Sequence, residues 1–156
     1  MSYQPNPELD LVLTREVDAS CEQVWKAWTV AEHLKVWFCP KPWQTIECEI
    51  DLRPGGRFYT RMQGPEGDQH ESCGCYLHIE PERQLIWTDA LGPDYRPNRE
   101  SFMTAMLTLE PLPGGTRYTA IAIHKDIESR QQHETMGFHQ GWSTALDQLV
   151  EYVKSW

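Results

Sequence analysis

Met136-Gly137-Phe138-His139-Gln140-Gly141-Trp142 is the most informative stretch of this chain. It lies within Asp126–Trp156, a segment whose pattern predicts one long helix. Each of its two glycines costs roughly 1 kcal/mol relative to alanine in a helix interior. Ala145 continues their spacing, and beside this strip of small residues the large apolar side chains recur at helical spacing: Phe138, Trp142, Leu146, Leu149 and Val153. The pattern predicts a helix that is approached closely, either by a packed sheet or by a cavity holding a small molecule.

The middle of the chain has a different period, with apolar and polar residues alternating as in half-buried antiparallel strands. Turn sequences such as Pro54-Gly55-Gly56 and Pro113-Gly114-Gly115 separate the alternating segments. The strands predicted in this way, including one near the amino end, are 9–17, 45–52, 57–63, 70–80, 84–91, 101–110 and 116–124.

Two short helices are predicted between the first strand and the second. Ser20 with Gln23, and Thr29 with Glu32, both fit the capping box, in which two side chains satisfy free amides at a helix start. Runs of adjacent strands with helices at the ends indicate an α+β domain on an antiparallel sheet. We expect a single domain over residues 1–156, with the terminal helix covering one face of the sheet.

Charge and composition narrow the classes of partner. The net charge is -9, which argues against a nucleic-acid partner and against an anionic membrane surface. No apolar run approaches the roughly 20 residues of a membrane span, and residues 1–7 lack the sections of a signal peptide. We therefore expect a cytoplasmic protein, whose five cysteines are reduced, buried thiols. Neither a metal site nor a cofactor is predicted, because no ligand set or phosphate-binding loop appears.

Several segments, in order along the chain, resemble a known family. They are Val24-Trp25-Lys26-Ala27-Trp28-Thr29, Asp51-Leu52-Arg53-Pro54-Gly55-Gly56-Arg57-Phe58, the stretch from Gly74 to Leu85, Gly114-Gly115-Thr116-Arg117, and Met136 to Trp142 with Leu146-Asp147-Gln148-Leu149. The chain resembles the helix-grip, START-like (SRPBCC) superfamily, in the branch named for the activator of the heat-shock-protein-90 ATPase. The resemblance implies a curved antiparallel sheet of six or seven strands wrapped around a long C-terminal helix, with two short helices after the first strand.

In that superfamily the space between sheet and helix is a cavity for apolar molecules, so the resemblance implies binding of an apolar or amphipathic small molecule. Seven tryptophans in 156 residues agree with an aromatic-lined site. The residues predicted to line it are Trp28, Trp37, Phe58, Tyr76, Trp87, Met103, Phe138 and Trp142. An alternative interpretation is that Phe138 and Trp142 simply fill the space.

Two other functions stay open at this point. An enzyme of cyclase or hydrolase type would use the same cavity, with His124, His139 or Tyr76 transferring a proton. Glu134, Asp89 and Arg61 are further candidates for the rim of such a site. A stress-related co-chaperone is implied by the branch name alone. An exposed edge strand would also support a homodimer.

Overall fold

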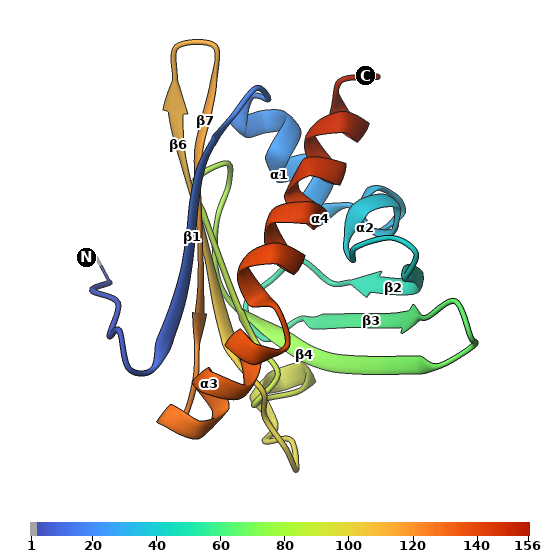
Figure 1. Cartoon of the computed structure of the whole chain (residues 1–156), viewed down its shortest axis with the longest axis vertical. Coiled ribbons are helices and arrows are strands. Elements are labelled where there is room, and N and C mark those ends of the chain that lie inside the picture. Colours follow the sequence, from blue (N-terminus) through green and yellow to red (C-terminus); the bar gives the residue numbers. More distant parts are fainter. Residues whose placement is uncertain (1–2) are drawn as a thin grey trace.

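The computed structural model describes residues 3–156, so the first two residues of the predicted domain lie outside the described residues. The chain forms a curved sheet with α-helices packed inside the curve (Figure 1). The strands are β1 (Asp10–Val17), β2 (Gln44–Ile50), β3 (Arg57–Gln63), β4 (Gln69–Glu80), β5 (Gln84–Thr88), β6 (Thr104–Leu112) and β7 (Gly115–Ile123). The α-helices are α1 (Cys21–Thr29), α2 (Ala31–Trp37), α3 (Ile127–Thr135) and α4 (Phe138–Val153), and a short 3-10 helix, η1, spans Pro93–Tyr95.

The seven strands form one antiparallel sheet in the order β1-β7-β6-β5-β4-β3-β2. β2 to β7 neighbour one another in chain order, whereas β1 pairs with β7 along its whole length, from Asp10 opposite Ile123 to Val17 opposite Thr116. Figure 1 shows β3 and β4 turned strongly away from the direction of β1, β6 and β7, with α4 inside the bend. The predicted α+β helix-grip architecture is confirmed.

The starts of the two short helices differ from each other. Ser20 and Gln23 form the predicted capping box: the Gln23 amide donates to Ser20 Oγ at 3.1 Å and the Ser20 amide to Gln23 Oε1 at 3.0 Å. The second predicted box is wrong, because α1 continues through Thr29, whose hydroxyl donates to the Trp25 carbonyl at 2.7 Å. α2 therefore begins after Val30, without a side-chain cap.

The single long C-terminal helix is also a wrong prediction, because the segment is broken into α3 and α4 at Gly137. Gly137 has φ +98°, a left-handed conformation that ends one helix and starts the next, and glycine adopts it at little cost. Nothing lies within 4 Å of the place of a Gly137 side chain, and only Pro40 Cγ, at 3.8 Å, lies near that of Gly141. The glycines therefore do not mark a close approach; Gly137 is needed for its backbone conformation.

The core lies between the concave face of the sheet and the helices. α4 buries its inner face, including Leu146, Leu149 and Val153, each 1% exposed or less. Opposite them, β6 and β7 turn small buried residues inward: Ala105, Ala120 and Ala122. The large side chains of α4 thus pack against a part of the sheet whose inward-facing side chains are small. None of the helices among residues 3–156 is long and apolar enough to span a membrane.

The two glycines provide a test with opposite expected signs. Gly137→Ala forces an L-residue into a left-handed conformation and should lower the free energy of unfolding by about 1 to 2 kcal/mol. Gly141→Ala adds a methyl group at ordinary contact distance inside α4 and should raise it by about 0.5 to 1 kcal/mol. Urea denaturation of the two variants measures both changes. A Gly137→Ala variant as stable as the wild type, or more stable, would contradict the assignment of Gly137 as the helix break.

Candidate functional site

Six aromatic side chains meet on the concave side of the sheet; they come from α1, from α2 and the residue after it, and from the neighbouring strands β3, β4 and β5. We call them the aromatic cluster: Trp28, Trp37, Phe38, Phe58, Tyr76 and Trp87. The ring centroids of Trp28 and Trp37 lie 4.8 Å apart, and the Phe58 and Tyr76 rings stack at 5.2 Å. Five of the eight predicted cavity residues are members. The sequence prediction missed Phe38, although it follows Trp37 directly.

The polar atoms within the aromatic cluster are unequally satisfied. The Trp28 indole N–H donates to the Tyr118 hydroxyl at 3.2 Å, and the Trp37 indole N–H donates to the Ala27 carbonyl at 3.0 Å. The Tyr76 hydroxyl is buried and has no hydrogen-bond partner within residues 3–156. A buried hydroxyl without a partner costs about 1 to 3 kcal/mol relative to a satisfied one. Tyr76 is therefore the member of the aromatic cluster that has a fully buried polar atom without a partner in residues 3–156.

The surroundings of Tyr76 keep its hydroxyl protonated. Burial raises its pKa well above that of a free tyrosine, and the Cys48 thiol is the second cause. Cys48, half-buried on β2, also has its pKa raised by burial, to about 12, although Lys35 opposes this shift. Both groups are thus neutral at physiological pH. The Tyr76 hydroxyl offers a hydrogen bond without a charge.

All five cysteines are free thiols. Cys21, Cys39 and Cys75 are buried, and Cys48 and Cys73 are half-buried. No set of three His, Cys, Asp or Glu side chains that could hold a metal ion occurs in the described part of the chain.

The other three predicted residues gather around the start of α4, away from the aromatic cluster. Phe138 is 1% exposed, and its ring lies 5.0 Å from that of Trp142. Met103 and Trp142 are half-buried and pack against both this end and the main core. The structure therefore divides the eight predicted residues into two neighbouring groups.

A pair of buried histidines lies beside Phe138. His124 Nε2 is 2.9 Å from His133 Nδ1, and His124 Nδ1 donates to the Leu9 carbonyl at 2.8 Å. Because a carbonyl only accepts, a neutral pair has one arrangement: His133 Nδ1 donates to His124 Nε2, and His133 Nε2 keeps a free lone pair. Burial, with a contribution from His124, lowers the pKa of His133 to about 4. His124 was among the candidates predicted from the sequence, but His133 was not, because only the fold brings the two side chains together.

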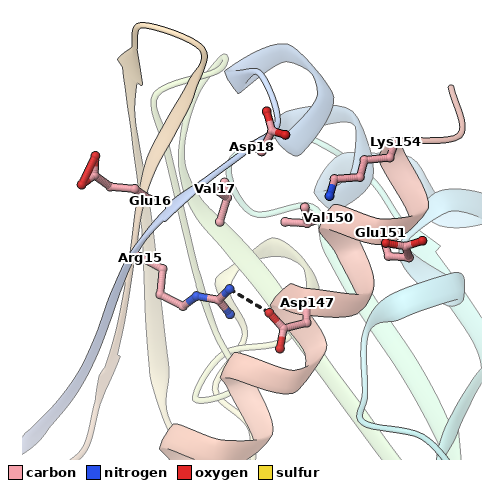
Figure 2. A pocket seen from close by; sticks show the side chains of 8 residues that line it. All are labelled: Arg15, Glu16, Val17, Asp18, Asp147, Val150, Glu151 and Lys154. Atoms are coloured by element: carbon pink, nitrogen blue, oxygen red, sulfur yellow. Dashed lines mark ion pairs between the residues drawn. The ribbon is translucent and has the colours of Figure 1, made fainter.

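One surface pocket of about 320 Å³ opens between β1 and α4 (Figure 2). Its lining is mostly charged: Arg15, Glu16, Val17, Asp18, Asp147, Val150, Glu151 and Lys154. Arg15 points across it, with Nη2 2.7 Å from Asp147 Oδ1 and Nη1 3.1 Å from both Ser143 oxygens, its carbonyl O and Oγ. These contacts tie the edge strand to the helix. Both Nη atoms of Arg15 are thus already paired with protein oxygens, those of Asp147 and Ser143.

A second pocket, of about 270 Å³, opens between α2 and β2. Its lining residues are Lys35, Val36, Phe38, Cys39, Lys41, Trp43, Gln44 and Thr45. We call it the α2–β2 pocket. None of the eight predicted cavity residues lines either of these two pockets, but Phe38 belongs both to the α2–β2 pocket and to the aromatic cluster.

The family model described as "Activator of Hsp90 ATPase homolog 1-like protein" matches residues 18–154, nearly the whole described fold. The chain belongs to this family. Members of the wider superfamily generally bind hydrophobic ligands. No curated protein matches the chain.

Solved structures extend the comparison. A crystal structure of a protein from Nitrosomonas europaea is 49% identical, covers 97% of each chain and has a TM-score of 0.95. A protein from Arthrobacter aurescens is 26% identical over 95% of this chain and 87% of that one, with a TM-score of 0.81. A protein from Aeromonas hydrophila named as similar to the same family is 20% identical, with 94% and 93% coverage and a TM-score of 0.70, and shows the shared fold.

The remaining polar candidates of this Hsp90-activator-like chain, His139, Arg61 and Asp89, are exposed or form contacts within the fold. The His139 side chain is 55% exposed and lies 3.9 Å from Glu134. Arg61 forms an ion pair with Glu47 on the neighbouring strand β2. The Asp89 carboxylate accepts the amide of Phe102 at 2.7 Å and that of Met103 at 3.1 Å, which fixes the loop before β6.

The histidine pair predicts how the stability of this family member depends on pH. The folded state holds His133 with a pKa of about 4, below the ordinary value of 6.5, so the folded state binds fewer protons than the unfolded state between these values. The contribution of neutral His133 is fully present above pH 6.5 and is lost as the pH falls toward 4. His133→Gln keeps an N–H donor but does not titrate. The stability difference between the wild type and His133→Gln should therefore shrink from pH 7 to pH 4.5, measured by urea denaturation; parallel pH profiles would refute this role.

Proposed function

We propose that this protein binds an apolar or amphipathic small molecule on the concave side of the sheet and does not transform it. The observation that carries the proposal is the Tyr76 hydroxyl, which is buried among aromatic rings with no partner in residues 3–156. Native proteins rarely leave a buried hydroxyl without a hydrogen bond, and one polar atom of a bound molecule would form that bond with Tyr76. The aromatic rings would supply the apolar contact area.

Binding requires a side chain to move, because the rings of the aromatic cluster lie within contact distance of one another. Phe38 is the half-buried member of the aromatic cluster, so its ring is the one that would turn outward. Ligand binding would then exchange protein–protein aromatic contacts for protein–ligand ones. The cost of this displacement sets an upper limit on affinity.

Binding is favoured over proton transfer by the state of the candidate groups. Tyr76 holds its proton firmly because burial raises its pKa, so it suits hydrogen bonding better than acid catalysis. His139 is largely exposed, and both ring nitrogens of His124 are engaged in hydrogen bonds. A hydrogen-bonding role is what these geometries support.

Deleting two buried hydroxyls tests the role of Tyr76. Tyr76→Phe removes a group that has no partner and should raise the free energy of unfolding of the ligand-free protein by roughly 1 to 3 kcal/mol. Tyr118→Phe is the matched control, since it strips the Trp28 N–H of its acceptor and should lower stability by a similar amount. Urea denaturation separates the two outcomes. A loss of stability in Tyr76→Phe would show that the hydroxyl is satisfied within the protein, against the proposal.

Native mass spectrometry of protein purified gently from its own host tests ligand binding directly. The wild type should retain a small-molecule mass that Tyr76→Phe retains to a lesser extent. A reproducible ligand-free mass in both proteins would count against the proposed function.

A further inference from the structure

The α2–β2 pocket is cationic in an otherwise acidic protein. Lys35 and Lys41 are its only charged lining residues, while the whole chain has a net charge of -9. Neither lysine forms an ion pair with a carboxylate of residues 3–156 within 4.0 Å. The acidic residues Glu32 on α2 and Glu49 on β2 do not line the pocket, and Glu49 is paired with Arg57 at 3.1 Å. The lining of the pocket therefore carries two positive charges and no negative charge.

Phe38 separates this pocket from the interior. Its side chain lines the pocket, and its ring lies 5.6 Å from those of Trp28 and Trp37 and 5.9 Å from that of Phe58. It is half-buried, whereas its three ring partners are buried. Turning this one ring outward would expose the aromatic cluster to the pocket.

Tyr76 lies directly behind Phe58, on which its ring stacks. The Phe58 ring also lies 5.9 Å from the ring of Phe38, which lines the pocket. Ring contacts therefore run from the pocket lining through Phe38 and Phe58 to Tyr76.

The backbone around the pocket is held firmly. Gln148 of α4 donates to the carbonyls of Trp37 and Cys39 at 3.1 and 2.8 Å, and its Oε1 accepts the Lys41 amide at 3.0 Å. The loop that presents Lys41 is therefore fixed to the long helix. The Phe38 ring makes aromatic contacts and no hydrogen bond, so it can turn without breaking one.

We propose that the α2–β2 pocket is the mouth of the ligand site and selects an amphipathic organic anion. Its carboxylate or similar head lies between Lys35 and Lys41, and its apolar body displaces the Phe38 ring toward the Tyr76 hydroxyl. This inference rests on the proposed function and adds the class of ligand and the path that it takes.

The test uses two probes of the same shape, 2-naphthoate and 2-naphthylmethanol, titrated calorimetrically into the full chain. At low salt the naphthoate should bind about tenfold more tightly, and the difference should fall as ionic strength rises. Lys35→Gln and Lys41→Gln should each weaken naphthoate binding by about three- to fivefold and leave the alcohol unaffected. Lys154→Gln, in the pocket between β1 and α4, is the matched control and should change neither probe.

The role of Phe38 is tested by rate. Phe38→Leu keeps an apolar side chain and shortens it, so the association rate constant for naphthoate should increase in stopped-flow tryptophan fluorescence. Unchanged or slower association in a folded Phe38→Leu variant would overturn Phe38 as the barrier.

The outcomes separate the two proposals. If the alcohol binds as tightly as the naphthoate, or the lysine variants match Lys154→Gln, the inference fails while small-molecule binding stands. If neither probe binds at millimolar concentration, the inference fails, and the retained mass in native mass spectrometry decides the proposed function. An anionic mass retained by the wild type and lost in the Lys35→Gln, Lys41→Gln double variant would support both.

Discussion

The connection between β1 and β2 is the constraint on which the rest of the structure depends. The two strands are consecutive in the sequence, yet they form opposite edges of the sheet. Their connection has to pass the five strands between them, which is six spacings of about 4.8 Å, or about 29 Å along the sheet. α1 and α2 make this crossing over the concave face, where the side chains of Trp28 and Trp37 are buried. The aromatic cluster is a consequence of that route, because it brings helix rings onto the residues of β3, β4 and β5.

Much of the fold could be predicted from local patterns. Alternating residues identified all seven strands, and the Ser20 capping box identified the start of α1, because both depend on short-range geometry. The failures also have local causes. Thr29 has the right side chain for a cap, but its hydroxyl is used by the preceding helix. Gly137 fits a helical period, and only its positive φ reveals that it interrupts the helix.

Less of the candidate site than of the fold could be predicted from the sequence. Aromatic residues of α1, α2 and the central strands were expected near one another, because they face the same side. The pairing of His124 with His133, the position of Phe38 between pocket and core, and the lack of a partner for Tyr76 depend on side-chain positions in three dimensions. No spacing rule links Lys35 to Lys41 across the end of a helix. These features became visible only with the fold.

The break at Gly137 gives the two C-terminal helices unequal anchorage. α4 has five buried residues, whereas α3 has one, His133, and is otherwise attached through its ends. A continuous helix would have transmitted the strong attachment of α4 to the preceding residues, and the left-handed glycine prevents this. We therefore expect α3 to open at a lower cost in free energy than α4, while the sheet and α4 remain folded. Its detachment would uncover Phe138 and leave the principal core intact.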